Sequence, residues 1–138
     1  MKTVSIIKGL LPAVMLIAAI TVCNGQDEKW VAPESAKKIK SPLPGAAQDE
    51  AVAAGKTLYA KHCKSCHGTT GKGDGPKASG LDKSCGDFTK EEFTSQSDGE
   101  IYWKTTEGKD PMPSYKKKIT EEERWQIVHY VRTLAKKK

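Results

Sequence analysis

The segment Cys63-Lys64-Ser65-Cys66-His67 constrains the fold more than any other feature, because two cysteines three positions apart are followed directly by a histidine. At the end of a helix, this spacing presents both thiols and the imidazole to one neighbouring group. A C-x-x-C pair can also be a redox disulfide, but such motifs accompany alternating strands and helices, a pattern that is absent here. It can also be half of a zinc site, but Cys85 alone does not supply a second pair.

The C-x-x-C-H pattern is typical of covalent c-type haem attachment, and we favour that interpretation over both alternatives. Two thiols at this spacing reach the two vinyl groups along one edge of the porphyrin. His67 is then carried beneath the ring with a nitrogen directed at the iron. The sequence therefore predicts that Cys63, Cys66 and His67 bind one haem, with His67 as an axial ligand.

Met112 is the expected second axial ligand. If residues 1–25 are removed, it is the only methionine left in the chain. It lies between two prolines, which stiffen the backbone and remove two amide donors. A His/Met pair raises the reduction potential of haem iron and closes the iron to other ligands, which favours electron transfer. His62 and His129 are competing ligands, and we interpret both as ordinary surface histidines.

The N-terminal segment, residues 1–25, has the layout of a secretory signal peptide. Its apolar run of 13 residues, Leu10–Val22, is shorter than the roughly 20 apolar residues of a membrane-spanning helix. Cleavage after Gly25 satisfies the small-residue rule, with Cys23 at the −3 position. Cys23 could instead be lipidated, but Val22 precedes it where a lipoprotein signal usually has glycine, alanine or serine. We therefore favour soluble export to the periplasm over lipid anchoring.

The charge of the chain is basic. Removing residues 1–25 takes away Lys2 and Lys8 and no acid, which leaves 21 basic and 17 acidic residues and a net charge of +4. Much of the excess lies in the lysine runs 116–118 and 136–138. A basic rim can steer an acidic redox partner, although the C-terminal run is better explained as solvated surface. We expect no nucleic-acid binding, because no recognition motif accompanies the charge.

Two regions follow the signal peptide. Residues 26–48 contain several prolines and no helical or strand period, which predicts an extended linker, or a strap held on the domain by Trp30 and Val31. Residues 49–138 carry the helical patterns of one domain. Their supply of apolar side chains is small for a stable core, so a large apolar group is expected to fill the middle.

Three main helices are expected in this domain. The first contains Gly55, which costs about 1 kcal/mol against alanine in a helix and therefore indicates a close helix contact. Capping boxes formed by Ser97 with Glu100, and by Thr120 with Glu123, open the other two. No strand pattern or internal repeat is seen. The sequence therefore predicts an all-α fold.

Together these features resemble the class I, mitochondrial-type cytochromes c, in the form of an exported bacterial member with one haem. The resemblance covers Asp49 to Lys138 and rests on Gly55, Tyr59, Cys63–His67, Met112, Ile127 and Tyr130. It implies a small fold with helices packed around one covalently attached haem, and with the first and last helices crossing near their ends. It also implies a monomeric, non-enzymatic carrier of single electrons in a respiratory chain.

The resemblance extends to residues around the haem. A carbonyl near Pro76 is expected to accept a hydrogen bond from His67. Trp103 and Tyr115 would either bond the haem propionates or simply line the pocket. Cys85, in a polar loop, has no part in this scheme, and we interpret it as incidental.

The expected partners are redox proteins with acidic docking surfaces. Any association of the chain with a membrane is expected to be indirect, through such a partner. The lysines expected to aid docking are Lys61, Lys64, Lys72, Lys77 and Lys116–Lys118. One alternative is an electron-relay subunit of a membrane oxidase or of a periplasmic dehydrogenase or reductase. Another is a ligand-binding haem sensor, against which Met112 argues because it closes the iron site.

Overall fold

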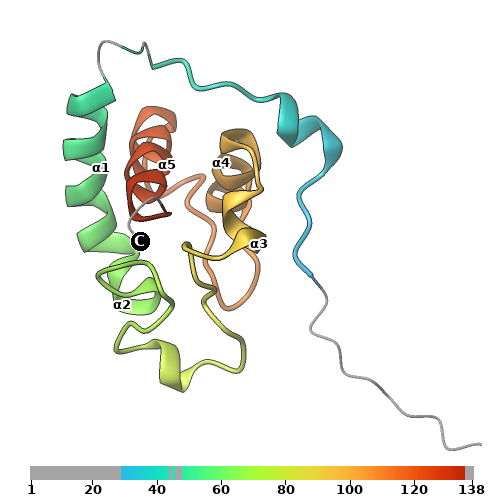
Figure 1. Ribbon diagram of the computed structural model, residues 1–138, viewed down its shortest axis with the longest axis vertical. Coiled ribbons are helices and arrows are strands. Elements are labelled where there is room, and N and C mark those ends of the chain that lie inside the picture. The colour runs from blue at the N-terminus through green and yellow to red at the C-terminus, as the bar shows by residue number, and fades with distance from the viewer. Residues whose placement is uncertain (1–28, 44, 46–47, 136–138) are drawn as a thin grey trace, which may run out of the picture.

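The computed structural model describes residues 29–43, 45 and 48–135. The predicted signal peptide, Cys23 and the last three lysines lie outside these residues. The described part consists of five α-helices and two short 3-10 helices, and its one β pairing is an isolated bridge between Lys109 and Met112 (Figure 1). The prediction of an all-α fold is confirmed.

The order of the elements is η1 (Glu34–Lys38), α1 (Gln48–His62), α2 (Lys64–His67), η3 (Ala78–Gly80), α3 (Glu91–Thr94), α4 (Asp98–Glu107) and α5 (Glu121–Ala135). Helices α1 and α5 lie side by side, and α4 lies on the other side of α5 (Figure 1). The long connection from α2 to α3 runs beneath them. These three long helices are the predicted ones, whereas η1 and α3 are not expected from the sequence.

Gly55 lies where α1 crosses α5. A Cβ at this position would be 2.0 Å from the carbonyl oxygen of Gln126, so glycine is what lets the two backbones approach. One turn further along α1, the Tyr59 ring packs 5.2 Å from the Tyr130 ring of α5. The close helix contact that Gly55 predicts is confirmed.

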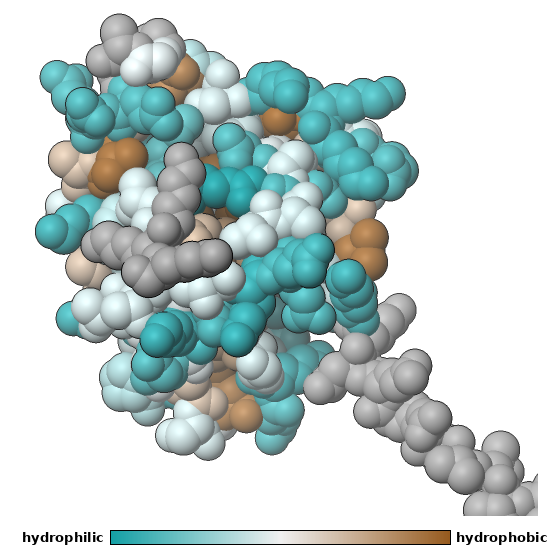
Figure 2. Space-filling model, viewed as in Figure 1, coloured by the Kyte–Doolittle hydropathy of each residue, from teal (hydrophilic) through white to brown (hydrophobic). Residues whose placement is uncertain are grey.

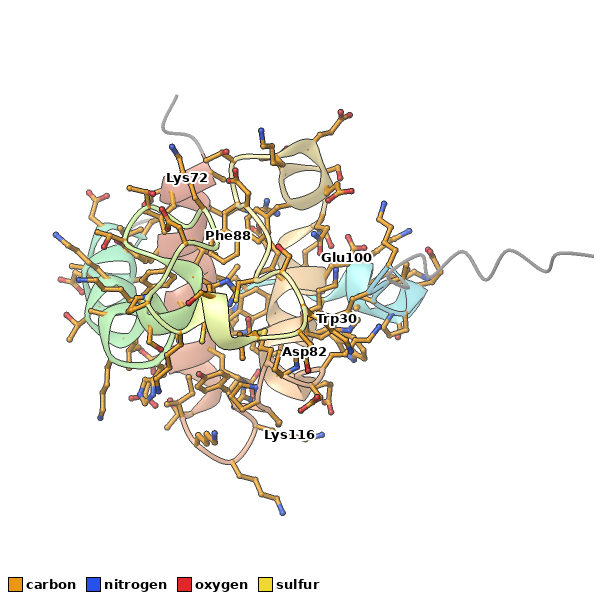
Figure 3. All side chains as sticks on the ribbon, turned by 90° about the horizontal axis from the view of Figure 1, so that it is seen from below. Trp30, Lys72, Asp82, Phe88, Glu100 and Lys116 are labelled. Atoms are coloured by element: carbon orange, nitrogen blue, oxygen red, sulfur yellow. The ribbon has the colours of Figure 1, made fainter. Side chains whose placement is uncertain are left out.

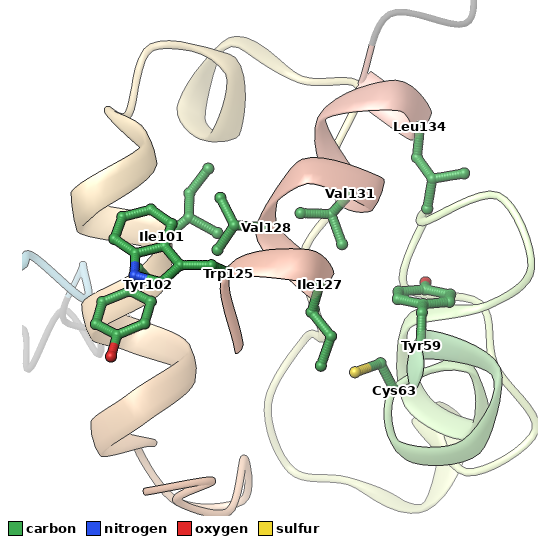
Figure 4. Packing of buried hydrophobic residues seen from close by; sticks show 9 residues of the cluster. All are labelled: Tyr59, Cys63, Ile101, Tyr102, Trp125, Ile127, Val128, Val131 and Leu134. Carbon is green, nitrogen blue, oxygen red and sulfur yellow. The ribbon is translucent and has the colours of Figure 1, made fainter. Parts of the chain in front are cut away.

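The hydrophobic core lies between α1, α4 and α5 (Figure 4). Trp125 of α5 is 1% exposed and stacks on Tyr102 of α4, with ring centroids 4.2 Å apart. Arg124 donates from Nη2 to the Tyr102 hydroxyl at 3.0 Å, which satisfies that buried oxygen. Cys63, at the start of the C-x-x-C-H motif, belongs to the same buried cluster. The motif is therefore built onto the core.

Both predicted capping boxes are present. The Ser97 hydroxyl accepts from the amide of Glu100 at 3.2 Å, and the Glu100 carboxylate accepts from the amide of Ser97 at 2.7 Å. Thr120 and Glu123 make the same reciprocal pair at 3.2 and 2.7 Å. Each box satisfies backbone donors that a helix start leaves unpaired, and so fixes where α4 and α5 begin.

The strap, defined here by the described residues 29–43, is more regular than its sequence predicts. Its η1 helix packs on α4 at Gly99, where a Cβ would be 2.1 Å from the carbonyl oxygen of Ala36. Trp30 packs against Trp103 of α4, with ring centroids 6.5 Å apart. Val31 is 65% exposed, so the prediction that it anchors the strap is wrong, whereas Trp30 packs on the domain as predicted.

The face of the molecule seen in Figure 2 is largely hydrophilic, with small apolar patches between charged residues. Across the residues that the structure describes, no helix is both long enough and apolar enough to cross a membrane. The lysines of the predicted basic rim are all exposed: Lys61, Lys64, Lys72, Lys77 and Lys116–Lys118.

Candidate functional site

A cavity of about 880 Å³ opens between α1, α4, α5 and the loops that precede α3 and α5. Its wall includes all four residues predicted to bind the cofactor, namely Cys63, Cys66, His67 and Met112. Cofactor pockets commonly have volumes of roughly 300 to 1,000 Å³. The fold therefore brings residues that are distant in sequence to one space of suitable size.

Cys63 and Cys66 present two free thiols to this cavity. Cys63 follows the last residue of α1 and is 8% exposed, whereas Cys66 lies in α2 and is half-buried. Burial raises the pKa of the Cys63 thiol to about 12, and the nearby Cys66 adds to this shift. Cys63 is therefore a protonated thiol at neutral pH.

The glycine-rich loop after the motif clamps the motif backbone. The amides of Gly73 and Gly75 donate to the carbonyls of His67 and Cys66 at 3.0 and 3.1 Å. A Cβ on Gly75 would be 2.4 Å from the carbonyl oxygen of Ser65, so the loop can close this tightly only with glycine there. The clamp depends on hydrogen bonds between the loop and the motif, which the C-x-x-C-H pattern alone does not predict.

The imidazole of His67 lies on the cavity wall beside Phe88, with ring centroids 4.9 Å apart. Its Nδ1 atom is buried and has no hydrogen-bond partner in the structure, so the hydrogen bond predicted with a carbonyl near Pro76 is not formed. Burial lowers the pKa of His67, and the adjacent backbone of Cys85 opposes this shift in part. A neutral imidazole results, which is the form that binds metals.

Met112 ends a tight turn whose first residue is Lys109. Each of these two residues donates its amide to the carbonyl of the other, at 2.8 and 3.0 Å, and the Asp110–Pro111 peptide bond between them is cis. Lys83 reaches over from the loop before α3 and donates from Nζ to the carbonyl of Asp110 at 3.2 Å. The Met112 side chain is half-buried on the cavity wall and is carried by a well-fixed backbone.

The two aromatic residues considered for propionate binding differ in position. Tyr115 lines the cavity, but its hydroxyl donates to the carbonyl of His62 at 2.7 Å, so that group is already engaged. Trp103 does not contribute to the cavity wall and packs instead against Trp30 of the strap. Trp30 is the tryptophan that lines the cavity.

The competing histidines also differ from the sequence interpretation. His62 is half-buried and lines the cavity, with its ring packed at 5.8 Å against the ring of Tyr115. It is therefore not an ordinary surface residue. His129 is half-buried away from the cavity, and its Nε2 is 2.9 Å from the hydroxyl of Ser41, a bond that fastens the strap to α5.

Several wall residues are not assigned to the site by the sequence, and three of them have side chains that bear on its chemistry. They are Trp30 of the strap, Lys104 of α4 and Cys85 of the loop before α3. Burial raises the pKa of the Cys85 thiol, and its neighbour Cys66 raises it further. No local pattern marks these residues, because their place on the wall arises from tertiary packing.

The wall residues fit a covalently attached haem. Two thiols three residues apart adjoin a neutral imidazole with an unsatisfied buried nitrogen, and a thioether side chain lies on the same wall. Apolar side chains such as Ile101, Ile127 and Val131 supply a lining for a flat apolar ring. This combination gives two attachment points and two metal ligands of the types found in c-type haem sites.

The chain belongs to the cytochrome c family, whose sequence model, described as Cytochrome c, matches residues 52–135. The match begins in α1 and ends with the last residue of α5. Members of this family carry a covalent c-type haem with iron and transfer electrons. Haem binding and electron transfer are therefore the general functions of this domain.

Several solved structures are similar to the chain, and two of them follow. One is the Kuenenia stuttgartiensis reducing HAO-like protein complex Kustc0457/Kustc0458, with a TM-score of 0.61 and 33% identity over 71% of this chain. This chain covers 50% of the matched subunit of that complex. The other is the KustC0563 c-type cytochrome, with a TM-score of 0.52 and 34% identity over 59% of this chain and 98% of that one. No curated protein is significantly similar to this chain.

Proposed function

We propose that this protein is a monomeric, exported electron carrier of the class I type, with one haem c bonded to Cys63 and Cys66. His67 and Met112 are its axial iron ligands, and the protein passes single electrons between respiratory partners in the periplasm. The observation that carries this proposal is the convergence of these four side chains on one cavity. One haem is expected because the sequence contains a single C-x-x-C-H motif.

The chain's own residues hold and enclose the cofactor. When bound, the haem supplies a one-electron ferric/ferrous couple. The two cysteine thioethers would fix its position, and the buried, neutral imidazole of His67 would bind its iron, while the loop clamp at Gly73 and Gly75 holds the motif. Met112 would be the second ligand of the haem iron and would leave no open position for a substrate. We therefore expect no catalytic activity from the chain itself.

An electron-relay subunit of a larger redox complex is the second candidate function. It is favoured by the 33% identity to a subunit of the Kuenenia HAO-like complex. This chain spans half the length of that subunit. The chemistry of the site would be unchanged, but the partner would be a permanent one. Elution of the native protein as a stable complex rather than as a monomer would favour the relay function.

The proposal is tested by producing the full chain in a bacterium that exports proteins and matures c-type cytochromes. We expect the signal peptide to be removed, the protein to appear in the periplasmic fraction, and its mass to include one haem that survives denaturation. The double variant Cys63→Ala/Cys66→Ala should lose the covalent haem, whereas Cys85→Ala should retain it. The proposal would be contradicted by a wild-type protein without covalent haem, or by a double variant that retains covalent haem.

A further inference from the structure

The wall of the cavity carries several positively charged side chains. Five lysine side chains line it, namely Lys29, Lys37, Lys83, Lys104 and Lys109. Lys37 forms an ion pair with Glu34 at 2.6 Å, and Lys83 donates to the carbonyl of Asp110.

Lys104 differs from these because it is half-buried on α4 and forms no ion pair within the described residues. Its Nζ donates to the neutral amide oxygen of Gln96 at 2.6 Å and lies 5.4 Å from the centre of the Trp30 ring. These contacts orient the ammonium group without neutralising it. An ammonium group removed from water in this way favours a nearby anion.

The charges around Lys104 strengthen its preference for a nearby anion. Burial lowers the pKa of Lys104, and the ammonium groups of Lys29 and Lys109 lower it further, against the opposing effect of Glu100. The Glu100 carboxylate accepts the amide hydrogen of Ser97 in the α4 capping box, so it is held at the start of the helix. Glu100 forms no ion pair with Lys104 among the described residues, so the ammonium group can still pair with an anion that enters the cavity.

Haem carries two propionate carboxylates at the edge opposite the vinyl groups that the cysteines bond. Helix α4, which carries Lys104, lies across the molecule from α2, which carries Cys66 (Figure 1). Trp30 and Glu100 lie on the same side of the view from below, and Phe88, next to His67, lies apart from them (Figure 3). The lysine side of the cavity is thus separate from the attachment side.

We propose that Lys104, beneath the Trp30 ring of the strap, binds a haem propionate as its ionic partner. This inference rests on the proposed function, because it requires a haem attached at Cys63 and Cys66. The strap then has a definite function at the site. Its Trp30 covers the ion pair from solvent and keeps the Lys104 side chain directed at the cavity.

The test compares holoproteins of wild type, Lys104→Gln, Lys104→Met and Lys104→Arg, with the exposed α1 residue Lys56→Gln as a charge-matched control. Midpoint potentials are measured by spectroelectrochemistry as a function of pH. We expect both neutral variants to lower the potential at neutral pH, since a nearby positive charge favours the reduced haem. The potential depends on pH through the ionisation of the propionate. We expect the pKa of this ionisation to rise by about one pH unit or more, as for a carboxylate that loses a cationic partner.

Lys104→Arg should restore the wild-type pH profile, and Lys56→Gln should leave it unchanged. Profiles for both neutral variants that superimpose on the wild type would overturn the propionate assignment while haem attachment stands. Absence of covalent haem from the wild type, read from its denatured mass, would instead refute the proposed function, and this inference with it.

Discussion

The hydroxyl group of Tyr115 donates a hydrogen bond to the backbone carbonyl of His62 at 2.7 Å. His62 is the last residue of α1 and directly precedes Cys63, while Tyr115 follows Met112 by three residues. This single bond therefore joins the chain segments that carry the proposed attachment site and the proposed distal ligand. The Tyr115 side chain is buried, so water does not replace the bond easily.

Replacement of Tyr115 by phenylalanine should remove this link while keeping the ring. We expect the free energy of unfolding to fall by about 1 to 3 kcal/mol, because the His62 carbonyl loses its side-chain partner. Met112 should dissociate from the haem iron before the whole domain unfolds. Urea titrations followed by far-UV circular dichroism and by the methionine–iron absorption band measure the two events. Tyr130→Phe is the control, since no hydrogen bond of the Tyr130 hydroxyl is found among the described residues, and equal curves for both variants would contradict the prediction.

Replacement of Gly55 by alanine should disrupt the α1–α5 crossing. The new Cβ would meet the backbone of Gln126 at 2.0 Å, and backbone cannot move aside as a flexible side chain can. We expect a loss of about 3 kcal/mol in the free energy of unfolding, or failure of the holoprotein to accumulate. Gly80→Ala is a matched control, because a Cβ there meets nothing within 4 Å. A Gly55→Ala protein as stable as Gly80→Ala would contradict the packing described.

The stability of the domain should fall in acid partly through the α4 capping box. The hydrogen bond from the Ser97 amide holds the pKa of Glu100 below its ordinary value of 4.5. Since the folded pKa is the lower one, this contribution is present above about pH 4.5 and is lost as pH falls through the folded pKa. Glu100→Gln keeps a side chain that can reach back to Ser97 but cannot titrate.

The free energy of unfolding of Glu100→Gln should therefore depend less steeply on pH below 4.5 than that of the wild type. Urea titrations between about pH 3 and pH 7 measure this slope. Glu50→Gln changes an exposed acid on α1 and serves as the control. Indistinguishable acid limbs for wild type and Glu100→Gln would rule out this role of the box.

Electron transfer to an acidic partner should depend on the exposed lysines near the motif. Attraction between unlike surfaces accelerates encounter and is screened by salt, so we expect stopped-flow reduction by an acidic flavodoxin to slow by about tenfold or more at high ionic strength. Lys72→Glu and Lys77→Glu should lower the rate at low salt more than Lys40→Glu, which lies on the strap. A rate that stays constant from low to high ionic strength would show that these lysines do not guide docking.

The features that the sequence predicts correctly are those whose cause is local. The two capping boxes are short patterns with one mechanical meaning, and both form as expected. Gly55 is informative because a glycine inside a helix has a cost that needs a compensating contact. The attachment motif is local too, and the structure places Cys63 and Cys66 on one wall.

The features that the sequence does not predict depend on contacts between distant segments. Helix η1 has no hydrophobic period, and it is held on α4 by the close approach of Ala36 to Gly99. Trp30, His62 and Lys104 reach the cavity only because the strap, α1 and α4 surround it. For the same reason the cavity is lined by Trp30 and not by Trp103, which the sequence suggests. The two rings pack together, and only the Trp30 ring lines the cavity.

The proposed ligands of the haem iron in this cavity are His67 and Met112. The most direct test of this assignment is the absorption band from methionine sulfur to ferric iron, measured in wild type, Met112→Ala and His62→Gln. We expect the band to be present in wild type and His62→Gln and absent in Met112→Ala, whose ferrous form should bind carbon monoxide readily. A wild-type protein that lacks the band and binds carbon monoxide just as readily would contradict this assignment.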